Sequence, residues 1–272
     1  MTRKTLPVSL LVSSSVALLL ASAVPATDWK PADPNRPHPP KVTPPIGDNG
    51  APSDAIRLFS GKDLAAWQHA KGKPADWKLA DDYMEVVPGT GDLQTKEPYG
   101  DCQLHVEWAA RFSPFPAEGA RFADGVVIKK FPPAFAGQWP GNSGVILMSL
   151  YEIQILESYE NTTYADGQAA AVYCQYPPLV NASLPLGQWQ TYDIVFHAPR
   201  FSDDGALQTP ATITLLHNGV LVQDHVSLTG PTTTARRPPY KAHAAKLPLT
   251  LQDHLQPVRY RNIWIRPLEE GK

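Results

Sequence analysis

The segment YEIQILES, residues 151–158, alternates polar and apolar side chains. On an extended strand successive side chains point to opposite faces, so Glu152 and Gln154 share one face while Ile153 and Ile155 share the other. A GNSG turn lies shortly before this segment, and its glycines let backbone approach a ligand closely. We therefore expect the strand to back onto a core and to present hydrogen-bonding groups to a ligand. The alternative is a solvated outer face, which antiparallel sheets often have.

The elements that must position these groups are all strands. Further alternating or apolar runs are rich in β-branched and aromatic residues, and proline and glycine separate them. HNG, between two such runs, predicts a tight hairpin because Asn-Gly suits a type I′ turn. The chain shows no helical period of useful length, so we predict a single all-β domain, a sandwich or jelly roll of two antiparallel sheets. The runs are YMEVV, CQLHVEW, GVILMSL, YEIQIL, TYDIVFHA, ATITLLH, GVLVQDHV and VRYRNIWIRPL.

The last of these runs, VRYRNIWIRPL, does not separate polar and apolar side chains onto opposite faces. Strict alternation places Arg259 and Arg261 together with Ile263 and Ile265. Because arginines and isoleucines do not share a core, we expect one of the arginines to lie at an edge or in a cleft.

The N-terminal residues have the features of a targeting segment. A short positive region with Arg3 and Lys4 precedes an apolar stretch, and small residues follow at offsets suited to cleavage. We predict a signal peptide over residues 1–23, so that the mature protein is secreted or periplasmic and is not inserted in a membrane. The alternative is an uncleaved membrane anchor. Residues 24–55 are dense in proline and predict an extended linker, which places the folded domain at 56–270.

The composition restricts the class of partner. The chain has 272 residues and a formal net charge of -2, so it lacks the basic surface that nucleic acid requires. A neutral or weakly polar ligand fits better. Cys102 and Cys174 either form a disulfide or remain as two buried thiols, and their spacing does not suggest a zinc site. The sequence gives no indication of the oligomeric state.

Several segments together resemble a known family. They occur in order along the chain from about residue 56 to residue 268: LFSGKDLAAW, GNSGVILMSLYEIQILES, GQWQTYDIVFHA, LHNGVLVQD and LTLQDHLQPVRYRNIWIRPL. The chain is similar in these segments to the 3-keto-disaccharide hydrolase domain family. The resemblance implies a concanavalin A-like sandwich, found in secreted or periplasmic proteins. It also implies hydrolytic or eliminative cleavage of glycosides oxidised at sugar carbon 3.

Such chemistry sets requirements for the site. A ketone at carbon 3 acidifies the hydrogen on carbon 2, so a base can remove it, the group on carbon 1 can leave, and water can then add. The enolate needs a positive or hydrogen-bonding group on its oxygen. The resemblance therefore implies these candidates: Glu152, His254 and Glu157 as acid and base, Arg261 or a bound divalent metal ion as oxyanion stabiliser, and Asn142, Gln154 and Gln252 for positioning hydroxyls. Asp253 either orients His254 or caps a turn.

Two alternative functions use the same sandwich. The spacing of Glu152, Gln154 and Glu157 mimics the E-x-D-x-x-E motif of laminarinase-type retaining glucanases, in which a bulge brings the last glutamate onto the face of the first. Gln154 cannot carry the negative charge of the middle acid, so we rank the retaining-glucanase hypothesis below cleavage of keto-glycosides. The other alternative is a non-catalytic carbohydrate-binding module, in which rings such as those of Tyr151 and Tyr173 stack on sugars.

The chain also carries a long excursion over residues 109–141. Long segments without regular structure often cover or border a binding site. We expect the excursion to be a lid over the concave face or an element of its rim.

Overall fold

The computed structural model describes residues 30–47, 50–114 and 137–268. The predicted signal peptide and most of the predicted lid, residues 115–136, lie outside the described residues. A compact unit spans Pro40–Leu268, and its first strand begins at Ile56. The described part of the predicted linker contains no helix or strand. Within the described ranges, no helix has both the length and the apolar character needed to cross a membrane.

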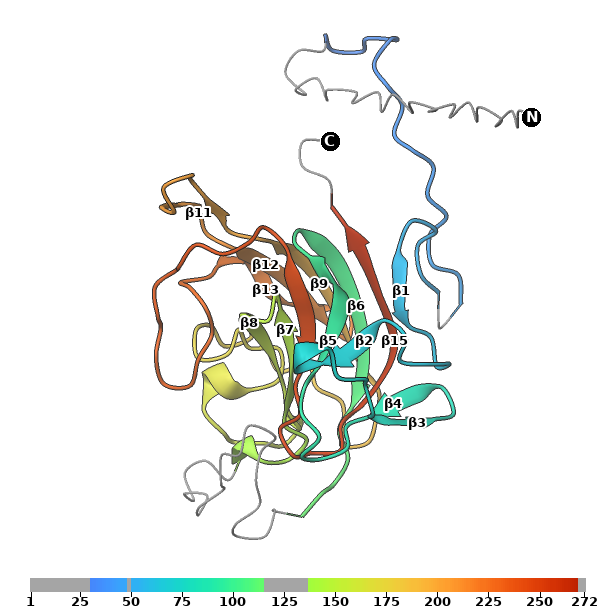
Figure 1. Ribbon diagram of the computed structural model, residues 1–272, viewed down its shortest axis with the longest axis vertical. Coiled ribbons are helices and arrows are strands. Elements are labelled where there is room, and N and C mark those ends of the chain that lie inside the picture. The colour runs from blue at the N-terminus through green and yellow to red at the C-terminus, as the bar shows by residue number, and fades with distance from the viewer. Residues whose placement is uncertain (1–29, 48–49, 115–136, 269–272) are drawn as a thin grey trace, which may run out of the picture. The chain divides into compact units, whose positions relative to one another are not determined.

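The compact unit is a sandwich of two antiparallel sheets, as predicted (Figure 1). In the large sheet the strand order is β13-β12-β9-β6-β15-β4-β3, with β1 also paired to β15. It contains β1 (Ile56–Phe59), β3 (Lys78–Ala80), β4 (Tyr83–Glu85), β6 (Cys102–Ala109), β9 (Gln190–His197), β12 (Thr212–His217), β13 (Val220–Ser227) and β15 (Arg259–Pro267).

The small sheet has the order β2-β5-β14-β7-β8. Its strands are β2 (Trp67–His69), β5 (Leu93–Tyr99), β14 (Leu247–Leu251), β7 (Ser143–Leu147) and β8 (Tyr151–Ile155). The other elements among the described residues are a two-stranded sheet of β10 (Arg200–Phe201) and β11 (Leu207–Thr209), and the 3-10 turns η2 (Ala70–Gly72) and η4 (Ala165–Gly167).

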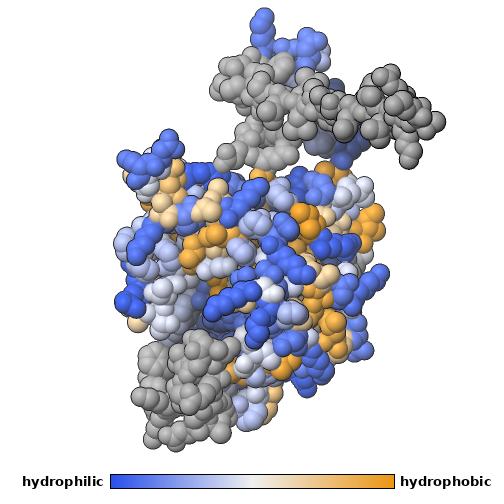
Figure 2. Space-filling view, viewed as in Figure 1, coloured by the Kyte–Doolittle hydropathy of each residue, from blue (hydrophilic) through white to orange (hydrophobic). Residues whose placement is uncertain are grey.

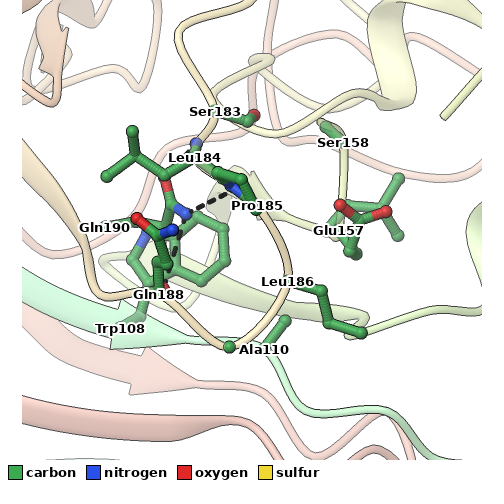
Figure 3. A pocket seen from close by; sticks show the side chains of 12 residues that line it. Trp108, Ala110, Glu157, Ser158, Ser183, Leu184, Pro185, Leu186, Gln188 and Gln190 are labelled. Atoms are coloured by element: carbon green, nitrogen blue, oxygen red, sulfur yellow. Dashed lines mark hydrogen bonds between the residues drawn. The ribbon is translucent and has the colours of Figure 1, made fainter. Parts of the chain in front are cut away.

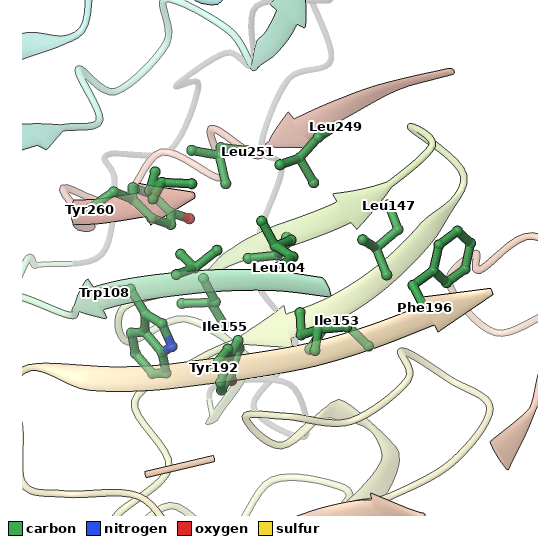
Figure 4. Close-up of a cluster of buried hydrophobic side chains, with 14 of the residues drawn as sticks. Leu104, Trp108, Leu147, Ile153, Ile155, Tyr192, Phe196, Leu249, Leu251 and Tyr260 are labelled. Carbon is green, nitrogen blue, oxygen red and sulfur yellow. The ribbon is translucent and has the colours of Figure 1, made fainter. Parts of the chain in front are cut away.

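The core lies between the two sheets. Ile153 and Ile155 of β8 are fully buried there, as the alternation of YEIQILES predicts. Figure 4 shows them with side chains from both sheets, among them Leu104, Tyr192 and Leu251. Because alternate side chains of a strand are buried in this core, the opposite face of the strand is the one that can meet a ligand. On the face seen in Figure 2, hydrophilic and hydrophobic residues are interspersed.

The predicted Asn-Gly hairpin joins β12 and β13. Asn218 and Gly219 both have positive φ, 53° and 77°, and His217 pairs with Val220 across the turn. Positive φ at both central residues is what a type I′ turn requires, and this confirms the prediction.

A bulge in β15 accounts for its mixed faces. The register with β6 shifts between Arg261 and Trp264, and Asn262 has φ 44°. The extra residue reverses the phase of the alternation, so Tyr260 and Ile263 both point into the core. Arg261 therefore lies on the outer face of the large sheet.

The two cysteines are free thiols. Cys102 is buried at the start of β6, where burial raises the pKa of its thiol to about 12. Cys174 lies in the loop after β8 and is partly exposed. A thiol with so high a pKa stays protonated, so Cys102 acts as a small hydrophobic side chain.

Candidate active site

The outer face of the small sheet carries a row of polar side chains. Gly144 and Ile146 of β7 pair with Gln154 and Glu152 of β8, and Thr250 of β14 continues the second row. Residues paired across neighbouring strands point to the same face. Glu152 and Gln154 therefore lie together on the face away from the core.

These side chains line a hollow of about 130 Å³, which we call the central pocket. Its floor comes from the small sheet and from the segments that adjoin its strands, and Thr233 and Thr234 of a distant loop close one side. The lining side chains from the predicted set are Asn142, Glu152, Gln154, Tyr173, Gln252 and His254.

A larger hollow of about 730 Å³ adjoins the central pocket, and we call it the long cleft. Gln252 and His254 line both, so the two form one continuous site. Asp92 and Gln94 line the long cleft, with Lys71 and Lys73 also contributing. The site is thus a groove with a narrow part at Glu152 and a wider polar part beside it.

Glu152 is the most perturbed acid of the groove. The residue is only 9% exposed. Its backbone N–H donates to Thr232 Oγ1 at 2.9 Å. Burial, with a smaller effect from the Asp92 charge, raises the pKa of Glu152 to about 8. Such a carboxyl is a stronger base than an ordinary glutamate once it is ionised.

Gly144 makes room for the Glu152 side chain. A Cβ at position 144 would lie 2.8 Å from Glu152 Oε1 and 3.1 Å from its Cγ. The absence of a side chain at this position therefore lets the carboxylate lie across β7 toward the centre of the groove.

We expect Gly144→Ala to displace the Glu152 carboxylate and to lower by about tenfold any turnover that depends on it, while the fold is retained. The nearest atom is the flexible end of a side chain, so the carboxylate can shift by a few tenths of an ångström. Small displacements of a catalytic group reduce rate strongly. Steady-state kinetics measures the loss, and thermal unfolding serves as the control. Unchanged turnover would mean that the position of this carboxylate is not critical.

Amide groups surround Glu152. Gln154 is 1% exposed and donates from Nε2 to Gln138 Oε1 at 3.1 Å. The Oε1 atoms of Gln154 and Gln252 are buried and accept no hydrogen bond in the described structure. A buried acceptor without a donor costs about 1–3 kcal/mol, so these two atoms favour a ligand with hydroxyl donors. Asn142 is held by its Nδ2, which donates to the Gln138 carbonyl at 2.5 Å.

His254 and Asp253 have different roles although they are adjacent. Burial lowers the pKa of His254 to about 4, so its imidazole is neutral at neutral pH. Asp253 accepts backbone hydrogen bonds from Gly89 and Gly91, at 2.7 and 2.9 Å, and from Leu255 at 2.9 Å. Of the two roles open to Asp253, the structure therefore shows the turn-stabilising one.

Tyr173 contributes a phenol to the central pocket. Its hydroxyl lies 3.0 Å from the hydroxyl of Tyr164, and its backbone N–H donates to the Glu152 carbonyl at 3.1 Å. Burial raises the pKa of both phenols above the ordinary value. The pair is therefore protonated at neutral pH and can donate a hydrogen bond.

Three predicted residues do not lie in this groove. Glu157 lines a small separate hollow with Trp108 and Gln190 (Figure 3). Its Oε1 accepts a hydrogen bond from the backbone N–H of Tyr159 at 3.1 Å. The reason is that β8 ends at Ile155 without the bulge that would return Glu157 to the face of Glu152.

Tyr151 and Arg261 are the other two. Tyr151 is fully buried on the core face of β8, and its hydroxyl bonds His243 Nε2 at 2.8 Å. Arg261 donates to Glu107 at 2.6 Å and lies over the Trp189 ring at 4.1 Å, on the outer face of the other sheet. Its prediction as oxyanion stabiliser is wrong, because the sandwich separates it from Glu152.

Sequence reasoning missed the role of Gly144 in making room for Glu152, and it missed Asp92 and the loop that carries Thr232. Only Gly144 has a local signal, because it is the last residue of GNSG, although the structure places it in β7 and not in a turn. The other two come from segments far from β8 in the chain, and no sequence period indicates that they meet it. Among the described residues, no group of three or more His, Cys, Asp and Glu side chains is arranged to hold a metal ion.

Comparisons with known proteins identify relatives of this chain. A family model for the 3-keto-alpha-glucoside-1,2-lyase-like domain matches residues 54–266. A crystal structure of a "putative glycosyl hydrolase" from Parabacteroides distasonis ATCC 8503 is 38% identical, with a TM-score of 0.76, and the match covers 87% of this chain and 95% of that one.

A second structure described in the same words, from the same organism, shares the fold. It is 17% identical with a TM-score of 0.54, and the match covers 79% of this chain and 94% of that one. No match is found among curated proteins.

Proposed function

Since this chain belongs to the 3-keto-alpha-glucoside-1,2-lyase-like domain family, we propose that it cleaves the glycosidic bond of 3-keto-glycosides, 3-keto-disaccharides included, by base-catalysed elimination. The observation that carries the proposal is a buried carboxyl, Glu152, with a pKa raised to about 8, in a pocket lined by amides. A base that abstracts a proton from carbon works best with a pKa near the operating pH, and amide groups can form hydrogen bonds with sugar hydroxyls.

The residues of the central pocket can be assigned roles in this reaction. The Glu152 carboxylate takes the proton from carbon 2, and the electron pair left there forms the enolate of the 3-ketone. The enolate then expels the group on carbon 1, which leaves a double bond between carbons 1 and 2. The departing oxygen receives a proton from the Tyr173 hydroxyl, and solvent returns the proton from Glu152 to Tyr173. Addition of water to the double bond gives the free 3-keto sugar.

The enolate oxygen needs hydrogen-bond donors in place of Arg261. Gln252 and the neutral imidazole of His254 both line the central pocket, and either can donate to that oxygen. A neutral donor suits this role because it does not add a charge that must be desolvated beside Glu152. Gln154 and Asn142 remain for the hydroxyls of the sugar.

The rate should rise with pH. Only ionised Glu152 can accept the carbon-bound proton, so we expect kcat/KM to increase by about tenfold per pH unit and to level off above about pH 8. A pH–rate profile of the wild-type protein measures this limb. A rate that falls as pH rises through this range would instead assign Glu152 as a proton donor.

Product analysis tests the proposed function itself. The purified domain is incubated with a chromogenic glucoside, with trehalose and with their 3-keto derivatives, alongside the Glu152→Gln and His254→Ala variants. We expect cleavage of the keto substrates only, and loss of it in both variants. Cleavage of unoxidised glycosides would favour direct hydrolysis, and binding without any cleavage would favour a carbohydrate-binding module.

We also propose that the protein is exported. The support is the sequence of residues 1–23, with its positive start, apolar stretch and small residues at the end. Expression of the full chain, followed by N-terminal sequencing of material outside the cytoplasm, tests this. A mature protein that begins near residue 24 is expected, and an intact N-terminus would contradict it.

A further inference from the structure

Another hollow, of about 440 Å³, lies next to the central pocket, and we call it the side pocket. Thr234 lines both hollows. The two phenols of the site also join them, because Tyr173 lines the central pocket, Tyr164 lines the side pocket, and their hydroxyls are 3.0 Å apart. A substrate group that leaves the central pocket past Tyr173 would enter the side pocket.

The walls of the side pocket are held together by side-chain contacts to backbone. Arg237 donates from Nε to the Cys174 carbonyl at 3.1 Å and from Nη2 to the Gln175 carbonyl at 2.9 Å. These contacts tie the loop after β13 to the loop after β8. The Tyr164 ring lies directly against Gly167, where no side chain would fit. The side pocket is therefore formed in advance of binding, and this reduces the cost of holding a ligand.

The chemistry of the side pocket differs from that of the long cleft. The long cleft presents hydroxyl, amide and charged groups from residues such as Gln94, Thr250 and Lys71, which suit sugar hydroxyls. The side pocket is lined by one aromatic residue, Tyr164, and by two arginines, and Asp166 is the one carboxylate among its described lining residues. The other lining residues are Cys174, Thr234 and Ala235. Aromatic rings and guanidinium planes both stack on flat unsaturated groups.

We propose that the side pocket is the subsite for the leaving group and that it accepts a planar aromatic aglycone. The inference rests on the proposed function, since it requires cleavage at carbon 1 in the central pocket. In this arrangement the glycosidic oxygen lies at the junction of the two pockets, beside the Tyr173 and Tyr164 hydroxyls. The aryl group lies on the Tyr164 ring, and the long cleft is left for substituents on the other side of the sugar.

The test compares phenyl and methyl 3-keto-α-glucosides as substrates of the wild-type protein and of two variants. For each protein, kcat/KM for the phenyl glucoside is divided by kcat/KM for the methyl glucoside. Comparing this ratio between a variant and the wild type cancels the intrinsic difference between the two leaving groups. We expect Tyr164→Ala to lower this ratio by about tenfold, because the stacking surface is lost. Tyr164→Phe keeps the ring, and we expect it to keep the ratio. An unchanged ratio in Tyr164→Ala would overturn the inference.

A binding measurement separates failure of this inference from failure of the proposed function. Absence of cleavage for both keto-glucosides would contradict the proposed function. Calorimetric titration of phenol into the wild-type protein, Tyr164→Ala and Tyr164→Phe then tests the subsite. Binding that is weakened in Tyr164→Ala and retained in Tyr164→Phe supports the subsite. Absence of binding to wild type, or equal binding to all three proteins, overturns it. Thermal unfolding of both variants verifies the fold.

Discussion

Replacing Glu152 with glutamine is expected to lower kcat on a 3-keto-glycoside by about 10²–10⁴-fold, the range typical of a lost general base. The amide retains the size of the side chain, so its fit over Gly144 is preserved. It cannot accept a proton from carbon, and the described residues that line the central pocket include no second carboxylate. Binding of the substrate should change much less than turnover, because Gln154 and Gln252 remain. Steady-state kinetics together with equilibrium binding separates the two effects.

The matched control for this experiment is Glu157→Gln. It makes the same chemical change five positions further along the chain, at a residue that lines the hollow with Trp108. We expect turnover close to wild type. A loss of turnover in Glu157→Gln as large as that in Glu152→Gln would favour the retaining-glucanase mechanism, since that mechanism needs both carboxylates.

The same Glu152→Gln change is expected to stabilise the folded protein at high pH. The pKa of Glu152 is raised from 4.5 to about 8, so between these values the folded state holds a proton that the unfolded state has released. The free energy of unfolding of the wild type therefore falls as pH rises through this window, and the loss is complete above about pH 8. Its size is on the order of 5 kcal/mol. Glutamine does not ionise, so the free energy of unfolding of the variant does not include this decrease.

Chemical denaturation of wild type and Glu152→Gln at pH 5 and pH 9 measures the effect. The other titrating groups are common to both proteins and cancel in the difference. We expect similar free energies of unfolding at pH 5 and a clear advantage for the variant at pH 9. An equal difference at both pH values would show that Glu152 titrates as an ordinary carboxyl, and the case for a raised pKa would be lost. This readout does not depend on any substrate.

Much of the fold follows from side-chain periodicity. The alternation in YEIQILES places Ile153 in the core and Glu152 on the opposite face, and the Asn-Gly pair at residues 218–219 predicts its hairpin. Both are local properties, set by the two-residue period of a strand and by the backbone of a turn. The polar face that Glu152 and Gln154 share was accessible to the same reasoning.

The remaining features depend on contacts that no local pattern shows. The bulge at Asn262 reverses the phase of β15 and leaves Arg261 on the outer face of the large sheet, which the core separates from Glu152. The end of β8 at Ile155 similarly leaves Glu157 in another hollow. Tyr151 follows the core face by simple alternation with Glu152, so its assignment to the site came from its residue type and not from its register.

The raised pKa of Glu152 has the same kind of origin. It arises from burial within the assembled groove and from Asp92, which precedes β5 in the chain. Sequence reasoning can identify a carboxylate on a polar face, but its environment comes from strands that are neighbours only in the sheet.

The central claim is that cleavage begins with removal of the hydrogen on carbon 2. The most direct test uses a 3-keto-glucoside that carries deuterium at carbon 2, with mass spectrometry of the sugar product. Elimination predicts a slower reaction than with the unlabelled substrate and a product that has lost its deuterium to solvent. A sugar product that retains the deuterium, formed at an undiminished rate, would show that the bond at carbon 1 is broken without elimination and would contradict the role assigned to Glu152.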